Sequence, residues 1–560
     1  ISNWPVYQGT SMDHYAHSLI QGINAAAREN QCNLLLGCGF SITGKSPQHH
    51  SIWSVPGEGI DFVPVGPWNT DGLIIVPDEL TETQLHYVRD LLDSGFPVIF
   101  TTPEGPGPLV SVDNTAGIQS AFTHLLSHGR RRVAFIAGNP GRGGDSEERL
   151  RAYQAALTNA GMKYIPGLCA YGEHRKEGGA AAMRQILASG EWFDALIASN
   201  DLSCIGAMEV LAQAGLRVPE DVAVVGFDDI VEARAVSPSL TTVRHPTFSL
   251  GYQAVATLLE YIRGQQARST KVVVPTRLVV RESCGCRPGT LEIQSARLTP
   301  DAIVHQMADA CFAEAHNSPI EEFQLRSAGL VDNFLLSCAR RDPTAWLDAV
   351  DQAVKWAEAH DENAAIWQAA SAILLQNLKN LAQLHPNLDL PYAALYLDQA
   401  RQEIARQLQQ ATTRSMVGYM QMISQLGRLT AEMLSAMSIE QTADILARHL
   451  PELGINNALV TLYEGGSDDP SAQGKVLFGA GFAANFGGLS FNPRAFPVPN
   501  LYPTTHPFQL TILPLTIEEN LSGFVAFDAP NPELCAALVH NLSAALRISA
   551  SPPQAFAAPT

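Results

Sequence analysis

The sequence lacks any uninterrupted apolar stretch of the roughly 18 residues that a membrane-spanning helix requires. Its first ten residues contain neither the basic nor the apolar segment of a secretory signal peptide. Cysteine is sparse: nine residues, an odd number, are scattered through 560, so the dense disulfide framework of a small secreted domain is absent. We therefore expect a cytoplasmic protein in a reducing compartment.

Basic residues are also in deficit, since 36 Lys and Arg stand against 55 Asp and Glu and give a net charge of −19. This balance opposes binding to a polyphosphate or an anionic membrane surface. No helix-turn-helix precedes the first folded unit, so we expect no direct nucleic-acid binding by this chain and no membrane partner. The length predicts three or four folded units, and 46% hydrophobic residues are typical of globular protein.

The first half of the chain, to about residue 285, alternates helical and strand periods. Its short apolar runs are unbroken, as expected for strands buried on both faces of a parallel sheet, and amphipathic helices separate them. The expected strands are 33–36, 73–76, 98–100, 133–136, 195–198 and 222–225, and the clearest helices are 14–29, 116–127, 147–160 and 203–214. Two near-equal halves, 1–108 and 109–240, predict two doubly wound α/β lobes, with the chain returning to the first lobe after Pro246.

The second half begins with helices. Residues 300–385 predict four of them, and residues 391–437 predict one continuous helix that is long enough for a coiled coil. Apolar residues recur along its second half at spacings of three and four, the seam of a parallel homodimer: Met416, Tyr419, Ile423, Leu426, Thr430, Met433 and Met437. The first half has a seam of its own: Leu397, Arg401, Ile404 and Leu408. A helix packed lengthwise on its own chain remains the alternative.

Residues 438–548 predict an α+β unit, and the Ala/Pro-rich end predicts a disordered tail. The unit begins and ends with helices, at 439–450 and 532–547, and its strands are expected at 458–463, 475–478, 509–515 and 523–527. The domains we expect are 1–287, 288–388, 389–437, 438–550 and 551–560.

A series of motifs in the first half occurs in the order found in one known family. They are Asp71-Gly72-Leu73-Ile74-Ile75, Val112-Asp113-Asn114-Thr115-Ala116-Gly117, Gly129-Arg130-Arg131-Arg132-Val133, Ser199-Asn200-Asp201, Val225-Gly226-Phe227-Asp228-Asp229 and Pro238-Ser239-Leu240-Thr241-Thr242. By these motifs the region resembles the ligand-binding part of the LacI/GalR family, whose fold is that of the type I periplasmic sugar-binding proteins. The resemblance implies a two-lobed fold and a small polyhydroxylated ligand, such as a sugar, between the lobes.

The resemblance also implies ligand contacts by Arg149, Asn200 and Asp228, with Phe227 beside them. Asn200 and Asp228 each follow a buried strand, at the edge where open α/β sheets bind ligands, and each can pair with adjacent hydroxyls. The alternatives are a turn or cap for Asp228 and a surface ion pair of Arg149 with Glu147 or Asp145. We interpret Asp113 and Asn114 as a helix N-cap.

Aromatic residues near the start could form the platform that sugar rings favour. Trp4, Tyr7 and Tyr15 are candidates, although core packing explains each equally well. Trp68, from the long insertion at 40–70, is a fourth candidate to reach the ligand.

Residues 438–548 resemble a GAF domain through Gly454-Ile455, the strand Ala458-Leu459-Val460-Thr461-Leu462-Tyr463 and Ser522-Gly523-Phe524-Val525-Ala526-Phe527. No residue in this unit marks a chromophore or cyclic-nucleotide site. The resemblance implies small-molecule binding or dimerisation.

Signals for catalysis or metal binding are weak. Cys284-Gly-Cys286 could bind a soft metal, but with no second C-x-C motif and no nearby His pair we interpret it as a packed turn. No catalytic motif stands out, so we expect no cofactor, no metal and no enzymatic activity. The sequence predicts a ligand sensor, a transcriptional regulator or the sensory half of a signalling protein, that transmits lobe closure through a dimeric helix; the alternative is a solute-binding protein for a transporter.

Overall fold

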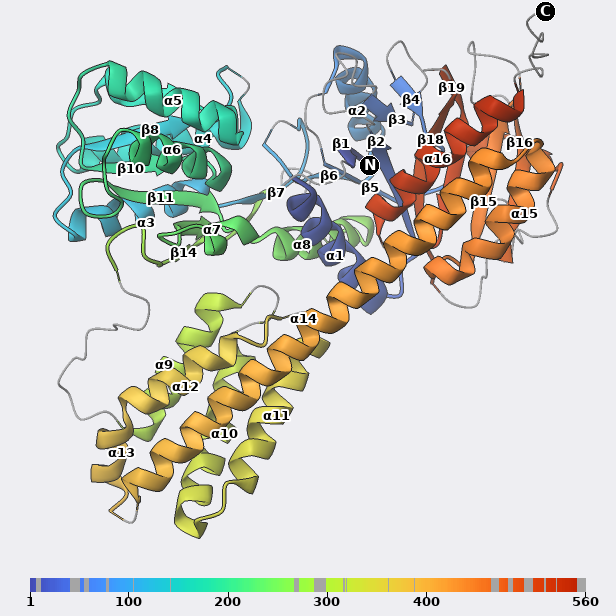
Figure 1. Ribbon diagram of the computed structural model, residues 1–560. Coiled ribbons are helices and arrows are strands. Elements are labelled where there is room, and N and C mark those ends of the chain that lie inside the picture. The colour runs from blue at the N-terminus through green and yellow to red at the C-terminus, as the bar shows by residue number, and fades with distance from the viewer. Residues whose placement is uncertain are drawn as a thin grey trace, which may run out of the picture.

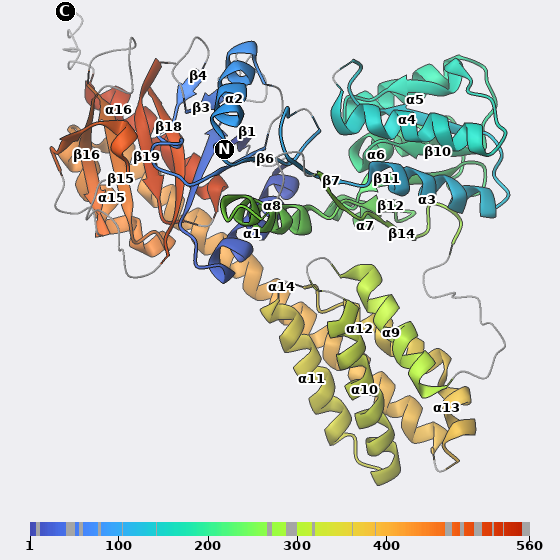
Figure 2. The same cartoon turned by 180° about the vertical axis from the view of Figure 1, so that it is seen from behind.

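The computed structural model describes residues 1–6, 12–40, 51–54, 60–76, 80–103, 105–141, 143–265, 271–286, 299–315, 318, 320–360, 362–386, 388–464, 473–481, 487–497, 507–517, 520–529 and 531–550. Two α/β lobes lie beside a C-terminal α+β unit, and a helical bundle lies below them (Figure 1). One long helix connects the bundle to the C-terminal unit, as the opposite view also shows (Figure 2). Among the described residues, no helix combines the length and the apolarity needed to cross a membrane.

The second lobe contains a six-stranded sheet with helices on both faces. The order is β14-β12-β11-β10-β8-β9, and only β14 runs antiparallel to its neighbour. The elements are α3 (Asn114–Ser127), β8 (Val133–Ala137), α4 (Gly144–Asn159), β9 (Cys169–Tyr171), α5 (Lys176–Ala188), β10 (Ala195–Ala198), α6 (Asp201–Gln213), β11 (Ala223–Asp228), α7 (Val231–Ala235), β12 (Thr241–Arg244) and β14 (Arg277–Val279). Every residue of β8 and β10 is buried, which confirms the prediction of strands covered on both faces.

The first lobe has a four-stranded sheet of order β13-β7-β6-β5. Its elements are β1 (Ser2–Val6), α1 (Met12–Glu29), β2 (Leu34–Phe40), β3 (Ser51–Trp53), β4 (Ile60–Phe62), β5 (Leu73–Ile75), α2 (Glu82–Ser94), β6 (Val98–Phe100), β7 (Leu109–Val112), α8 (Thr247–Ile262) and β13 (Lys271–Val274). The chain returns here after Pro246, as the sequence predicts: α8 packs on α1, and β13 pairs with β7.

The C-terminal unit is joined to the first lobe, a connection that the sequence did not predict. Strand β2 pairs in parallel with β18, so one seven-stranded sheet of order β1-β2-β18-β19-β15-β16-β17 runs through both. The elements of this unit are α15 (Ile439–His449), β15 (Ala458–Tyr463), β16 (Gly474–Ala480), β17 (Ser490–Phe491), β18 (Gln509–Ile517), β19 (Asn520–Phe527) and α16 (Pro532–Ala550). A common core backs the join, in which Trp53 and Phe100 of the lobe pack with Phe496 and Phe524 of the unit.

The helical bundle contains α9 (Pro300–Glu314), α10 (Ile320–Arg340), α11 (Thr344–Ala359), α12 (Ile366–Gln376) and α13 (Leu378–Leu384).

 The described residues of the bundle form five helices where the sequence predicted four, because the last predicted helix is divided at Asn377 into α12 and α13. The amide Nδ2 of Asn377 donates to the carbonyl of Ile373 (2.9 Å), a local bond that competes with helix continuation.

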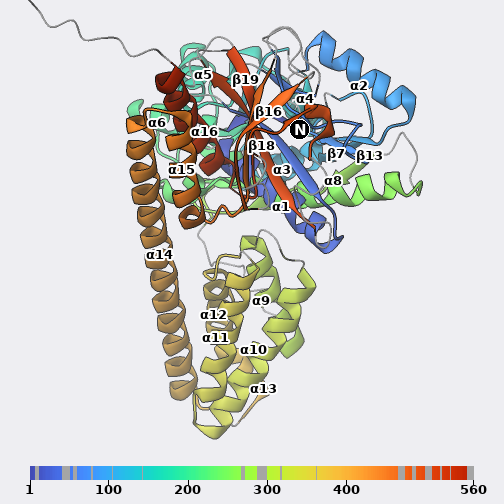
Figure 3. The same ribbon diagram turned by 90° about the vertical axis from the view of Figure 1, so that its right-hand side faces the viewer.

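The long helix α14 (Leu390–Ser435, 46 residues) confirms the predicted continuous helix. Both of its ends pack on their own chain: Leu397 and Ile404 lie in the core of the bundle, and Met433 lies in the core of the C-terminal unit. The alternative of a helix packed lengthwise is therefore correct at both ends. The middle of α14 stands clear of both units in the side view (Figure 3), and there Tyr419 and Ile423 are 63% and 65% exposed.

The close contact of α1 with α8 depends on glycine and yields a stability prediction. A Cβ at Gly251 would lie 2.1 Å from the carbonyl oxygen of Leu19, so Gly251→Ala must separate the two helices and should cost about 1–3 kcal/mol. Gly329→Ala, in a helix position with no atom within 4 Å of the added Cβ, is the matched control and should stabilise by up to about 1 kcal/mol. Thermal unfolding of both variants tests this, and equal melting temperatures would contradict the packing.

Candidate functional site

The candidate site lies where β10 and β11 end, at the carboxyl edge of the second lobe's sheet. Asp228 is the last residue of β11, and Asn200 follows β10 directly. Arg149 reaches the same place from α4, and Asn114 reaches it from the first turn of α3. Four separate elements thus bring polar side chains together at the edge where open α/β sheets bind ligands.

Arg149 is the centre of this cluster and is only 4% exposed. Its Nε donates to Oδ1 of Asn114 (2.8 Å), and its Nη1 donates to the carbonyl of Ser199 (2.6 Å). Nη1 also lies 3.4 Å from Oδ1 of Asp228, and the guanidinium carbon lies 3.7 Å from the ring centroid of Phe227. The surface pair with Glu147 or Asp145 is therefore not the arrangement that the structure shows.

Asp228 combines a strained backbone with a carboxylate that its surroundings stabilise poorly. Its φ is +113°, a region that side-chain-bearing residues rarely adopt. Burial raises the pKa of its carboxyl to about 6, against the lowering effect of Arg149, and nearby Asp145 raises it further. Any additional hydrogen-bond donor near this carboxylate would stabilise its charged form.

Asn200 is placed at the site, but its side chain is used by the protein. Its Oδ1 accepts from the backbone N–H of Ser203 (3.0 Å) as the N-cap of α6, and its Nδ2 donates to the carbonyl of His174 (3.0 Å). A ligand contact by Asn200 stays a prediction, and it would have to share these atoms.

Asn114 belongs to the cluster, which the sequence did not predict. Asp113 is the N-cap of α3 as expected, accepting from the N–H of Ala116 (2.8 Å). Asn114 instead is buried, and its Nδ2 donates to Asp145 (2.7 Å) and Glu148 (3.0 Å) while its Oδ1 accepts from Arg149. In the sequence, Asn114 is marked only by its position directly after Asp113, the residue that follows β7. This position does not distinguish a helix-capping residue from a residue of the candidate site.

Two neutral histidines border the cluster. Burial, with a smaller effect of the Arg149 charge, lowers the pKa of both His174 and His245 to about 3. His174 pairs through Nε2 with the hydroxyl of Ser146 (2.6 Å). His245 packs edge-on against Tyr15, with ring centroids 5.1 Å apart, and its Nδ1 is buried without a hydrogen-bond partner among the described residues.

The other aromatic candidates are not brought to Arg149. Trp68 lies against the C-terminal unit, where the guanidinium of Arg494 covers its ring at 5.1 Å, because the first lobe and that unit share a core. The structure thus gives Trp68 a packing role against that unit, and its contact with a ligand stays a prediction. Tyr7 and the side chain of Trp4 lie outside the described residues.

A buried ion cluster lies directly behind the candidate site. Asp229 pairs with Arg244 and Arg281, each at 2.5 Å, and with Arg234 at 3.8 Å. Burial alone would raise the pKa of Asp229, but the three arginines hold it below its ordinary value. Arg244 also donates to the carbonyl of Ala315 at the end of α9, and Arg277 donates to the same carbonyl (3.2 Å). The residue beside Asp228 is thereby connected to the helical bundle.

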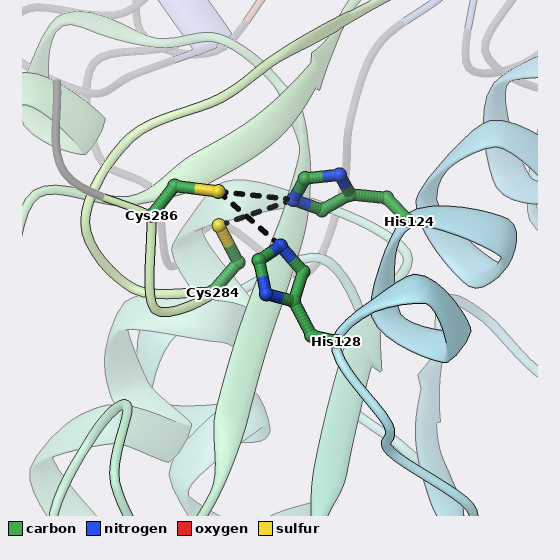
Figure 4. Close-up of side chains that lie close together, drawn as sticks. All are labelled: His124, His128, Cys284 and Cys286. Carbon is green, nitrogen blue, oxygen red and sulfur yellow. Dashed lines mark hydrogen bonds between the residues drawn. The ribbon is translucent and has the colours of Figure 1, made fainter. Parts of the chain in front are cut away.

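The interpretation of Cys284-Gly-Cys286 as a turn without a nearby His pair needs correction. His124 from α3 and His128 from the C-cap of that helix point toward the two sulfurs, and one ligand atom from each of the four residues lies within 4.8 Å of the others (Figure 4). The sequence could not show this because 160 residues separate His124 from Cys284, and β12 and β14 have to pair before the two segments meet.

Comparison with known proteins supports the two-lobed region. The family described as periplasmic binding protein-like domain matches residues 122–284. The HTH-type transcriptional regulator CelR of Thermobifida fusca is 34% identical over 262 residues, which are 45% of this chain and 74% of CelR. The HTH-type transcriptional repressor CytR of Escherichia coli is 32% identical over 186 residues, 33% of this chain and 54% of CytR, so the chain spans about half of that relative.

Solved structures of such regulators are also similar. A CelR–cellobiose complex shares 32% identity and covers 48% of this chain and 79% of its own, with a TM-score of 0.39. A LacI-family regulator from Sanguibacter keddieii shares 30% identity and covers 50% and 96%, also with a TM-score of 0.39. The curated relatives are transcriptional regulators and not enzymes, which confirms that expectation. Because it matches three quarters of CelR at 34% identity, the chain belongs, through its two-lobed region, to the LacI/GalR family of transcriptional regulators.

Proposed function

We propose that this chain is a cytoplasmic ligand-sensing regulator that binds a small sugar or sugar derivative between its two lobes. Arg149 and Asp228 would hold the ligand hydroxyls, and Phe227 and Tyr15 would contact its apolar faces. Kinship with CelR, for which a complex with cellobiose has been solved, favours a saccharide. The C-terminal unit, in which α15 and α16 pack on one face of the antiparallel strands β15 to β19, is proposed as a GAF-like domain.

The observation that carries the proposal is the state of Asp228. Its carboxylate accepts from Arg149 only at 3.4 Å, although its neighbour Asp229 is fully paired. A polyhydroxylated ligand supplies O–H donors in adjacent pairs, which match the two oxygens of a carboxylate. The carboxylate of Asp228 can accept further hydrogen bonds, and the hydroxyl groups of a sugar can donate them.

Ligand binding would reach the helical bundle through Asp229. A ligand that binds the closed arrangement of the lobes more tightly shifts the population toward it. Any change at Asp228 acts on the adjacent Asp229, whose partner Arg244 bonds Ala315 at the end of α9. From the bundle, α14 continues to the C-terminal unit (Figure 3).

The exposed middle of α14 is the proposed homodimer contact. Of the predicted seam, Met416, Tyr419 and Ile423 are each more than 60% exposed and spaced by three and four residues. Met433 is buried in its own chain and is not available to a partner. The proposed parallel pairing is therefore shorter than the seam that the sequence predicted.

The first test replaces the Asp228 carboxylate. Asp228→Asn keeps the shape and tolerates positive φ, but it removes an acceptor, so affinity should fall by about 10- to 100-fold, equivalent to roughly 1–3 kcal/mol. The apo melting temperature should hardly change, because Arg149 keeps its bonds to Asn114 and Ser199. Titration calorimetry with the best ligand from a panel of cellobiose, other saccharides and nucleosides measures the loss.

The control is Asp221→Asn, which removes an exposed carboxylate paired with Arg217 (2.9 Å) and should bind as the wild type does. Unchanged affinity in Asp228→Asn, or a much lower melting temperature without ligand, would assign the carboxylate a structural role.

The second prediction concerns pH. Since the pKa of Asp228 is raised to about 6, the carboxylate is present above that pH and is lost as pH falls through it. Affinity should be constant above about pH 7 and fall by up to roughly tenfold per unit below pH 6. Neutral His174 and His245 do not titrate in this range. Binding curves from pH 5 to 8 should therefore bend in the wild type and stay flat in Asp228→Asn; a bend in both would exclude Asp228 as its source.

The third prediction concerns assembly. A charge on the exposed stripe, in Ile423→Glu, should convert a dimer of the full chain to a monomer, because a carboxylate facing its copy is desolvated beside a like charge. Leu325→Glu is the control, since Leu325 is 70% exposed on a different helix. Light scattering decides: a monomeric wild type, or a dimeric Ile423→Glu, removes this contact.

A further inference from the structure

A cluster of two cysteines and two histidines lies at the end of the second lobe away from the ligand site. His124 lies in the last turn of α3 and His128 is the residue that caps this helix, whereas Cys284 and Cys286 come from the segment that follows β14 (Figure 4). Nε2 of His124 lies 3.2 Å from Sγ of Cys284 and 3.8 Å from Sγ of Cys286. Nε2 of His128 lies 3.2 Å from Sγ of Cys286.

These separations match a tetrahedral metal centre. Zinc binds thiolate sulfur at about 2.3 Å and imidazole nitrogen at about 2.0–2.1 Å, so tetrahedral angles separate a sulfur from a nitrogen by about 3.6 Å. The three separations lie around that value, and all four ligand atoms fall within 4.8 Å of one another. Small adjustments of side-chain torsions would suffice to place a cation among them.

The backbone presents both pairs of ligands in a suitable way. His128, the C-cap of α3, follows His124 by four residues, about one helical turn, and the two ring centroids lie 4.7 Å apart. Between the cysteines, Gly285 has φ +101°, which a side chain would disfavour, and the resulting tight turn directs both sulfurs toward α3. Cys284 is buried and is held further by the hydroxyl of Thr241, which lies 3.1 Å from its sulfur.

We propose that Cys284, Cys286, His124 and His128 bind a zinc-class divalent cation. The donor set of two sulfurs and two imidazole nitrogens is the one that favours Zn²⁺ over hard cations such as Mg²⁺ or Ca²⁺. Each thiol would release its proton to solvent, and two thiolates with two neutral imidazoles balance the charge of the cation. Four protein ligands leave no open position, so the site is structural.

The cation would hold the segment that leaves the second lobe. In that segment Arg281 bonds both Asp229 and the carbonyl of Leu240 (2.9 Å). Helix α3 begins at Asn114 in the candidate ligand site and ends at the cluster. The metal would thereby hold the end of α3 against the segment of Arg281, which pairs with the same Asp229 as Arg244, the residue that contacts Ala315 at the end of α9.

The test measures metal in the full chain. Reduced protein that has been incubated with excess Zn²⁺ and desalted should contain one zinc per chain, as measured by inductively coupled plasma mass spectrometry. Cys286→Ser and His128→Gln, both at the more accessible side of the cluster, should each lose affinity by at least about 100-fold, because even a partner outside the ligand shell is worth roughly 10- to 100-fold. Co²⁺ should give the thiolate charge-transfer and intense visible absorption of tetrahedral cobalt in the wild type alone.

The matched control is the double variant Cys32→Ser/His86→Gln, which removes the same two residue types at sites away from the cluster and should bind one zinc. A wild type that retains no more zinc than Cys286→Ser would overturn the proposal. So would a Cys284–Cys286 disulfide in the protein isolated without oxidant, or a cobalt spectrum without thiolate bands.

Discussion

The buried carboxylate of Asp229 is the interaction on which the rest of the arrangement depends. Three arginines converge on it, from β12, α7 and the segment after β14. An unpaired charge at 1% side-chain exposure would be very costly, so the carboxylate and its arginines must be placed together. This requirement fixes the backbone at Asp228, orders the segment that carries Cys284, and places Arg244 against the end of α9.

Ligand site and ion cluster are adjacent in sequence but opposite in character. Asp229 has its pKa lowered and its partners complete, while Asp228 has its pKa raised and one long contact. Of these two neighbouring carboxylates, Asp229 is held within the fold, and Asp228 is the one for which we propose a ligand contact. Such poorly satisfied polar groups reduce stability and are kept where binding requires them.

The sequence was informative where the signal is local. Buried strands such as Ala195–Ala198 and the uninterrupted α14 follow from apolar periodicity. Arg149 and Asp228, which the family motifs indicate, lie 3.4 Å apart, and their contact with a ligand stays a prediction. Strand β2 pairs with β18 although several hundred residues separate them in the sequence. His124 likewise meets Cys284, which lies 160 residues further along the chain. No periodicity reports such contacts. The exposed seam of α14 was overestimated for a related reason: an apolar stripe does not say whether its own chain or a copy covers it.

The central claim is that a ligand at Asp228 is sensed at the end of α9 through Asp229 and Arg244. Hydrogen–deuterium exchange of the full chain, with and without a saturating saccharide ligand, tests it most directly. The account predicts slower exchange at 226–230 and also a ligand-dependent change around 312–315, where Arg244 bonds Ala315. Protection confined to the two lobes, with exchange around Ala315 unaffected, would contradict it.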